Sequence, residues 1–128
     1  MLIDSSAWIE AIREAGDPDY IAHVDLLLAD RRAATCEVVI VEVLQGATSA
    51  AELAMLGEQL RGLVPLAMDG AGEEAGRLAW ALRRRGVTVQ TTDLLIAATA
   101  HLHGAALLHR DVHLAQAAEA LGLQVVEP

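Results

Sequence analysis

The 128-residue sequence contains no lysine and no phenylalanine, so its nine basic residues are all arginines and its aromatic residues are two tryptophans and one tyrosine. Any chemistry that depends on a lysine ammonium group is therefore excluded. With so few aromatic rings, stacking on nucleic-acid bases is expected to be a minor source of binding energy.

The sequence also has only one cysteine, Cys36, and no long apolar run. A lone cysteine excludes an internal disulfide and is typical of a reducing compartment. The longest apolar stretch, residues 94–108, is interrupted by two histidines and a glycine, so it does not reach the length of a membrane-spanning helix. No basic leader of a signal peptide precedes the first apolar residues. We therefore expect a cytoplasmic protein without a membrane segment.

Charge and apolar content point to partners. The formal net charge is −9. The first 64 residues hold eleven acidic residues and four arginines, whereas residues 65–128 hold seven acidic residues and five arginines. Three of those five arginines are consecutive, Arg83, Arg84 and Arg85, and they indicate either a basic patch or a solvated helix end, where cations are favoured.

Apolar residues make up 54% of the chain. This fraction is high for a small protein, so some apolar surface is expected to contact a partner.

The order of elements predicts a single α/β domain over residues 1–128, because the chain is long enough for one core and too short for two. Strands and helices alternate, which predicts a mainly parallel sheet of four to five strands with helices on both faces. Residues 37–48 are ambiguous, since their β-branched residues favour a strand whereas Glu42 and Gly46 suit a buried helix. Pro65 indicates an edge strand or a strand start. The predicted strands are residues 1–4, 33–36, 63–68, 105–111 and 123–127, and the predicted helices are residues 5–16, 18–32, 49–62, 70–85, 91–104 and 112–122. Asp17 suits the N-cap of the second helix, and Ser49 with Glu52 predicts a capping box at the start of the third.

Four carboxylates stand at positions where such a fold collects functional groups. Asp4 and Asp111 each end a predicted strand, and the carboxyl ends of parallel strands meet at one edge of the sheet. Asp93 lies in the first turn of a predicted helix, where a negative charge is favoured. Glu42 is surrounded in the sequence by valine, isoleucine and leucine, and a buried carboxylate without a counter-charge is costly.

Each acid also has a simpler explanation. Asp4 and Asp111 suit the caps of the helices that follow them, Asp93 suits a helix start, and Glu42 suits a solvent-facing position. Together, however, four converging acids without a lysine would repel one another unless a divalent cation were present, and oxygen-only ligands favour Mg²⁺ or Mn²⁺. A zinc site is the alternative, but its ligands lack the usual spacing. Those ligands would be Cys36, His101, His103, His109 and His113.

These residues carry a family resemblance that extends over essentially the whole chain. The segments LIDSSAWIE, TTDLLIAATAHLHGAALLHRD and HLAQAAEALGLQVV, with the glutamate of VVIVEVLQG, resemble a PIN domain, and specifically the VapC ribonuclease toxins of bacterial toxin–antitoxin pairs. The resemblance implies a three-layer PIN-like sandwich in which residues 37–48 are largely helical. It also implies that Asp4, Glu42, Asp93 and Asp111 form the catalytic and metal-binding set, with Ser6 supporting it.

The function implied by the resemblance is metal-dependent hydrolysis of RNA phosphodiester bonds by an activated water, with Mg²⁺ or Mn²⁺ as cofactor. A homodimer and a cognate VapB-type antitoxin are implied as partners. We place Arg83, Arg84, Arg85 and Arg110 on the RNA-binding surface, because they dominate the positive charge of the less acidic half. The helices near residues 18–32 and 49–62 are candidate protein-binding surfaces, with Ile21, Leu27, Leu28, Leu53, Leu56 and Leu60 as the apolar side chains.

Two other classes remain as alternatives. A phosphoacceptor receiver domain has a similar length, the same alternation of strands and helices and an acidic Mg²⁺ pocket, but its phosphoryl-binding lysine has no counterpart here. A PIN domain that serves as a non-catalytic scaffold would share the fold, although all four acids are present in this sequence.

Overall fold

The computed structural model describes residues 1–4, 6–8, 17–109, 112–122 and 125–126. Within them, five parallel strands form one sheet in the order β3-β2-β1-β4-β5. The strands are β1 (Leu2–Ile3), β2 (Ala34–Thr35), β3 (Val64–Pro65), β4 (Leu107–Leu108) and β5 (Val125–Val126). The helices are α2 (Pro18–Ala29), α3 (Glu37–Gln45), α4 (Ala50–Arg61), α5 (Ala71–Arg84), α6 (Thr91–Leu102) and α7 (Val112–Leu121), and residues 6–8 are also helical.

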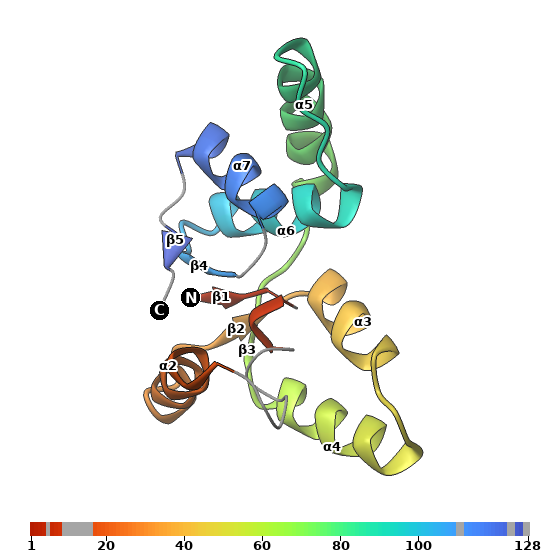
Figure 1. Ribbon diagram of the computed structural model, residues 1–128, viewed down its shortest axis with the longest axis vertical. Coiled ribbons are helices and arrows are strands. Elements are labelled where there is room, and N and C mark those ends of the chain that lie inside the picture. Colours follow the sequence, from red (N-terminus) through yellow and green to blue (C-terminus); the bar gives the residue numbers. More distant parts are fainter. Residues whose placement is uncertain (5, 9–16, 110–111, 123–124, 127–128) are drawn as a thin grey trace.

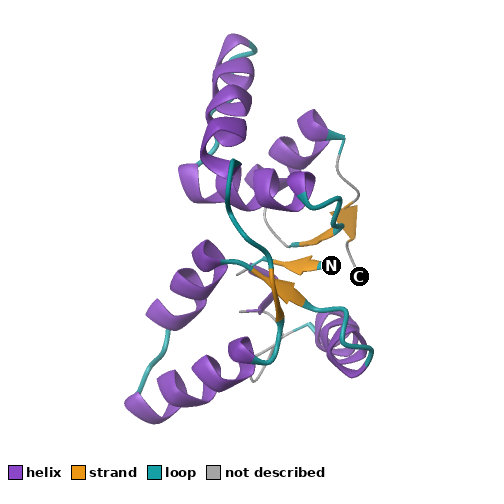
Figure 2. Ribbon diagram, turned by 180° about the vertical axis from the view of Figure 1, so that it is seen from behind, coloured by secondary structure: helices purple, strands orange, loops and turns teal. Residues whose placement is uncertain are grey.

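The elements form three layers. Helices α5, α6 and α7 lie on one side of the sheet, and α2, α3 and α4 lie on the other (Figures 1 and 2). Every strand pair is parallel, so each connection must cross over a face of the sheet, usually through a helix. The predicted α/β sandwich with a parallel sheet is confirmed. In the described part of the chain, no helix is both long and apolar enough to cross a membrane.

Strand β1 lies in the middle of the sheet and is completely buried. Leu2 and Ile3 have no exposed surface, and neither have Leu107 and Leu108 in the neighbouring strand β4. Parallel strands covered on both faces favour continuous apolar residues over an alternating pattern. The short apolar runs of the sequence therefore predicted these strands correctly.

Helix α3 resolves the ambiguity over residues 37–48. It spans Glu37–Gln45 and buries Val39 and Val43, which stand four residues apart on one helical face. Burial of that face outweighs the modest preference of β-branched residues for strands. The helical assignment implied by the family resemblance is therefore confirmed.

Two helix starts follow the capping chemistry that the sequence predicted. The Asp17 side chain accepts a hydrogen bond of 2.9 Å from the Asp19 N–H at the start of α2, and the Ser49 hydroxyl oxygen accepts one of 3.0 Å from the Glu52 N–H at the start of α4. The Glu52 carboxylate does not complete a capping box in the expected way; it accepts a 2.9 Å hydrogen bond from the Thr48 hydroxyl. Both predicted caps are confirmed.

Strand β3 forms one edge of the sheet, as Pro65 predicted. The Val64 N–H donates to the Ala33 carbonyl at 3.1 Å, and the Leu66 N–H donates to the Thr35 carbonyl at 2.8 Å. Because an edge strand pairs on one side only, a residue without an N–H is tolerated there.

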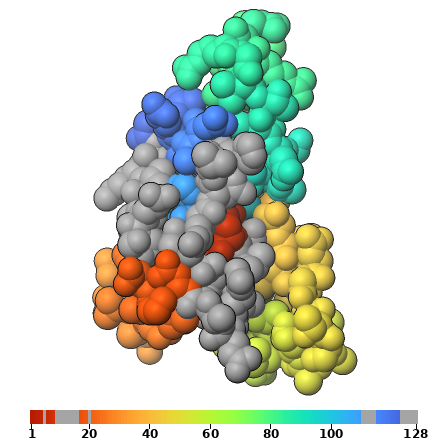
Figure 3. Space-filling view, in the orientation of Figure 1, coloured from red at the N-terminus to blue at the C-terminus, as the bar shows by residue number. Residues whose placement is uncertain are grey.

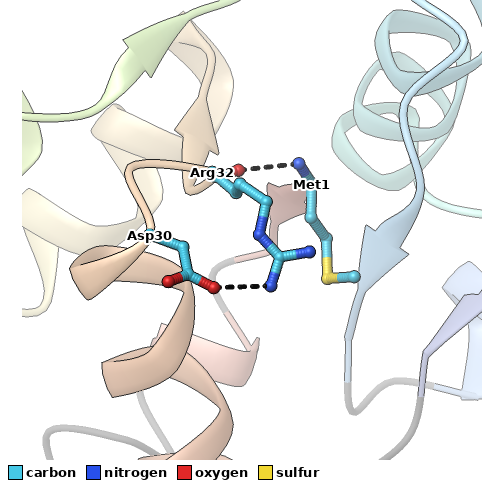
Figure 4. Close-up of polar contacts among 3 residues, drawn as sticks. All are labelled: Met1, Asp30 and Arg32. Atoms are coloured by element: carbon cyan, nitrogen blue, oxygen red, sulfur yellow. Dashed lines mark hydrogen bonds and ion pairs between the residues drawn. The ribbon is translucent and has the colours of Figure 1, made fainter.

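The turn between α2 and β2 is joined to the start of the central strand. Arg31 has a positive φ of 54°, which reverses the chain after α2. The Met1 amino group donates a 2.8 Å hydrogen bond to the Arg32 carbonyl, and the Arg32 guanidinium pairs with Asp30 at 3.0 Å (Figure 4). The ion pair is exposed and so contributes little.

The predicted protein-binding face of α2 and α4 is only partly exposed. Three of its side chains, Leu27, Leu56 and Leu60, are buried in the core, so their assignment to a surface was wrong. They lie on the inner faces of their helices, whereas Leu28 and Leu53 remain exposed. The remaining apolar surface on these helices is smaller than the sequence predicted.

We expect loss of the Ser49 cap to destabilise the fold measurably. A Ser49→Ala variant removes the acceptor for the Glu52 N–H and should lower the free energy of unfolding by about 1 kcal/mol. A Ser49→Asp variant keeps an acceptor and should unfold close to the parent. Urea unfolding monitored by circular dichroism would measure both, and equal midpoints for alanine and aspartate would contradict the capping role.

Candidate functional site

Asp4 is held by backbone hydrogen bonds at the carboxyl end of the central strand. Its N–H donates to the Leu108 carbonyl at 2.9 Å, and its own carbonyl accepts hydrogen bonds of 3.1 Å from the Ala7 and Trp8 N–H groups. The first contact continues the pairing of β1 with β4, and the second two begin the helical turn at residues 6–8. The main chain at Asp4 therefore changes from strand to helix.

The two carboxylate oxygens of Asp4 have different surroundings. Oδ2 accepts a 3.0 Å hydrogen bond from the Ser6 N–H and another from the Ser6 hydroxyl. Among the described residues, Oδ1 is buried and has no hydrogen-bond partner, and the whole residue is only 2% exposed. The capping explanation of Asp4 is thus correct for one oxygen. It leaves the other buried and unsatisfied, an arrangement that needs a further partner to offset its cost.

Asp93 occupies the third position of α6 and is 6% exposed. At this position the carboxylate lies near the positive end of the helix dipole, which stabilises a negative charge. The N-cap residue, Gln90, makes no side-chain capping bond. Asp93 is therefore the residue that brings negative charge to the start of this largely buried helix.

Glu42 lies on α3 and is half-buried. The neighbouring residues Val39 and Val43 are buried, whereas Val41 is 60% exposed. A helix places consecutive residues about 100° apart, so residue 42 stands between the core face and the solvent face. The sequence suggested an enclosed carboxylate, but the structure places Glu42 at the boundary of the core.

The elements that carry these acids meet at one edge of the sheet. Helix α3 and the start of α6 lie beyond the carboxyl end of β1 (Figures 1 and 2), and α3 contacts α6. Among the described residues, however, no group of three or more His, Cys, Asp or Glu side chains is positioned to hold a metal ion. Asp111 and Arg110 lie outside the described residues.

The donor chemistry at this edge nevertheless fits a hard divalent cation. The buried, unsatisfied Oδ1 of Asp4 is an oxygen ligand of the kind that Mg²⁺ and Mn²⁺ prefer. Asp93 and Glu42 add carboxylates from the adjoining helices. Carboxylates brought together at one edge repel one another, and a bound cation would offset that repulsion.

Three buried polar residues lie at or just beyond the ends of the neighbouring strands β2 and β4: Thr35, Cys36 and His109. Continuing the register of β1 with β2 and β4 places Cys36 and His109 level with Asp4, and both are buried. Thr35 is buried as well, and its hydroxyl oxygen has no hydrogen-bond partner within the described ranges. The sequence indicated Cys36 and His109 only as alternative zinc ligands, and it did not single out Thr35, which stands next to the end of the predicted strand 33–36.

Cys36 is not an activated nucleophile. Burial raises the pKa of its thiol, and the nearby charges of Asp4 and Glu37 act in the same direction, whereas backbone N–H groups at the start of α3 partly oppose them. A thiol with a raised pKa stays protonated at neutral pH and reacts slowly.

The histidines do not form a zinc site in the described part of the chain. His103 Nε2 lies 2.7 Å from the Ala67 carbonyl oxygen, and His101 Nε2 lies 3.8 Å from a carboxylate oxygen of Glu74. Both histidines are exposed near the end of α6, whereas His109 is buried. Their contacts join α6 to the segments that precede it.

The consecutive arginines lie at the end of α5, which projects from the body of the protein (Figures 1 and 3). Arg83 and Arg84 form its last turn, and Arg85 is its C-cap, where positive charge is favoured by the helix dipole. The Arg84 guanidinium carbon lies 4.4 Å from the centre of the Trp80 ring. The patch is thus carried on a projecting helix and is separate from the carboxylates at the sheet edge.

Comparison with known proteins gives consistent results. The PIN domain family model matches residues 1–120. The chain is 38% identical to the VapC ribonuclease Mb1587 of Mycobacterium bovis and to ribonuclease VapC11 of Mycobacterium tuberculosis, over 97% of this chain and 96% of each relative. Its fold resembles that of DNA-bound VapBC from Salmonella typhimurium, with a TM-score of 0.79, 21% identity and coverage of 98% of this chain and 95% of the other.

We expect the Cys36 thiol to be protected in the folded protein. Ellman's reagent reacts with thiolates, so burial and the raised pKa of the thiol should slow native labelling roughly tenfold or more relative to unfolded protein. The rate of absorbance change at pH 8, with and without denaturant, measures this protection. Comparable rates in the two conditions would show that Cys36 is accessible in solution.

Proposed function

The chain belongs to the PIN-domain family, and from this premise we propose that it is a metal-dependent endoribonuclease that acts as the toxin of a type II toxin–antitoxin pair. The two mycobacterial relatives are named VapC ribonucleases and match nearly the full length of the chain. Membership of this family decides against the receiver-type alternative. We propose further that residues 1–128 form a single PIN domain.

The state of Asp4 is the observation that carries the proposal. This carboxylate is buried at the end of the central strand. One oxygen is hydrogen-bonded to Ser6, and the other has no hydrogen-bond partner in the part of the chain that the structure describes. A purely structural cap would leave no reason to bury the second oxygen. A ligand site gives that oxygen a role and offsets its desolvation cost.

Asp4, Glu42, Asp93 and Asp111 would hold Mg²⁺ or Mn²⁺. When bound, such an ion lowers the pKa of a water molecule and stabilises the charge that develops on a phosphodiester during hydrolysis. The choice between the two ions, like the exact ligand set, is part of the proposal. Hard oxygen donors from separate elements suit either ion.

The chain's own residues prepare this site. Ser6 donates its N–H and its hydroxyl to Oδ2 of Asp4, which fixes the orientation of the carboxylate. The start of α6 stabilises the charge of Asp93 through the helix dipole. Helix α3, held by Val39 and Val43, presents Glu42 from the boundary of the core. No histidine base is needed in this arrangement.

The RNA-binding surface is proposed to include Arg83, Arg84, Arg85 and Arg110. RNA phosphates are neutralised by arginine, and this contribution to affinity falls as the salt concentration rises.

The proposed compartment is the cytoplasm, where RNA is available and where the free thiol of Cys36 would remain reduced.

The proposed partners are a VapB-type antitoxin and a second copy of the chain. Solved VapBC complexes share the fold. The structure leaves large apolar side chains exposed on three helices, and such side chains favour protein contacts. These are Leu26 and Leu28 on α2, Val41 on α3, and Leu53 and Met55 on α4.

We expect divalent metal to bind and RNA to be cleaved only when the carboxylates are intact. Asp4→Asn should reduce metal-dependent cleavage of bulk RNA by roughly two orders of magnitude, equivalent to about 2.7 kcal/mol of transition-state stabilisation. Asp93→Asn should weaken Mg²⁺ or Mn²⁺ binding in calorimetric titration, because it removes a ligand charge.

Asp69→Asn is the matched control, because this aspartate is exposed and stands outside the proposed ligand set. It should cleave RNA and bind metal like the parent. Equal cleavage by Asp4→Asn and Asp69→Asn would contradict the proposed site. Metal binding by the parent without any RNA cleavage would instead indicate a non-catalytic scaffold.

We also expect the isolated chain to sediment as a dimer at micromolar concentration, since its exposed apolar side chains on α2, α3 and α4 favour association. Sedimentation velocity would measure the mass, and adding the co-encoded antitoxin should produce a larger complex. A well-folded monomer that binds no antitoxin would contradict both proposed partnerships.

A further inference from the structure

Trp80 is a large aromatic side chain that lies exposed on the described surface. Its side chain is 61% exposed, whereas the other tryptophan, Trp8, is buried. The Arg84 guanidinium lies 4.4 Å from the centre of the Trp80 ring, within the range of a cation–π contact. A large ring is thereby held in a defined position on the projecting helix α5, even though no core contact covers it.

A hollow lies beside this ring. Its volume is about 360 Å³, and its lining residues all belong to α5: Gly76, Ala79, Trp80, Arg83 and Arg84. A side-chain carbon added at Gly76 would meet no atom within 4 Å, so the space over this residue is open. Positions 76, 80, 83 and 84 are spaced by three and four residues and therefore share one helical face.

The two charged residues that line the hollow, Arg83 and Arg84, are both positive. Arg77 and Arg32 form ion pairs with Glu73 and Asp30, but within the described residues Arg83, Arg84 and Arg85 form none. No acidic residue lines the hollow. On a chain with a net charge of −9, this face is a local site of uncompensated cations beside an exposed aromatic ring.

We propose that Trp80 and Arg84 form a stacking platform for an unpaired base of single-stranded RNA, with Gly76 leaving room for the base and Arg83 contacting an adjacent phosphate. The proposal rests on the nuclease function proposed above and assigns part of its substrate contact to α5. An aromatic ring flanked by arginine is a sequence-tolerant way to bind single-stranded nucleic acid.

Charge favours RNA over a protein as the occupant of this face. An apolar protein interface would leave three arginines to be desolvated without acidic partners, which is costly. A polyanion with π-faced bases satisfies the cations and covers the ring at the same time. The platform also gives RNA a contact away from the carboxylates, so it would help to hold the substrate without taking part in hydrolysis.

Binding can be measured with the full chain carrying Asp4→Asn, which keeps the RNA intact, and a short labelled oligoadenylate. Trp80→Leu on this background should raise the dissociation constant about five- to hundredfold, the range expected for loss of one stacked base. RNA should quench tryptophan emission in the Asp4→Asn protein but not in the Trp80→Leu variant, in which only the buried Trp8 remains.

Two glycines of α5 provide a matched pair of variants. Gly76→Leu fills the hollow and should weaken RNA binding, whereas Gly72→Leu fills an equally open position on the same helix outside the hollow and should not. Leucine favours a helix more than glycine does, so both variants are expected to fold. Arg83→Gln should reduce the slope of log K against log salt by about 0.7, because one phosphate contact is lost.

Cleavage of RNA by the parent chain, measured in parallel, separates the two proposals. If the parent cleaves RNA but Trp80→Leu and Gly76→Leu bind oligoadenylate like the Asp4→Asn protein, the platform is wrong and the nuclease proposal stands. A Trp80→Leu change that alters the sedimenting mass and leaves RNA affinity unchanged would identify a protein interface and overturn the platform. A parent that neither cleaves nor binds RNA contradicts both proposals.

Discussion

The pair of hydrogen bonds that Ser6 donates to one oxygen of Asp4 is the interaction on which the proposed site depends. It satisfies Oδ2 locally and leaves Oδ1 buried with no hydrogen-bond partner from any described residue. The orientation is reinforced by the main chain, because Asp4 is fixed between a buried strand and the following helical turn. The stability of the rest of the core offsets the cost of burying an unsatisfied oxygen. Folding alone would therefore orient this carboxylate for the proposed ligand.

The carboxylates of the proposed site and the arginines at the end of α5 occupy separate parts of the protein. The carboxylates lie where α3 and the start of α6 meet the central sheet, and the arginines, which form no ion pair within the described residues, stand at the far end of α5. Each location also suits the local helix dipole, with acid at the start of α6 and base at the end of α5. Because the arginines at the end of α5 lie away from the carboxylates of the site, a local positive surface can exist on a chain with a net charge of −9.

Most elements could be predicted from the sequence because their signals are local. Asp17 and Ser49 mark helix starts through hydrogen bonds within three residues, and the strands are short apolar runs. Helix α3 needed the family resemblance, since burial of Val39 and Val43 depends on packing that propensity does not encode. The inward faces of Leu27, Leu56 and Leu60 were misjudged for the same reason.

The candidate site was predictable only in part. Asp4 and Asp93 could be located from their positions at a strand end and a helix start, and both are buried at those positions. The boundary position of Glu42 depends on the rotation of α3 about its axis, which the sequence pattern alone left open. The exposure of Trp80 depends on how far α5 projects from the other helices. A tryptophan in a short chain would ordinarily be expected in the core.

The proline in β3 has a consequence for the behaviour of the protein in concentrated solution. Val64 and Leu66 direct their N–H groups toward β2, so the residue between them directs its backbone nitrogen toward the open side of the sheet. That residue is Pro65, whose nitrogen carries no hydrogen. A strand from another molecule that approached this edge would find no N–H donor at Pro65. The missing donor discourages edge-to-edge pairing of sheets and therefore aggregation.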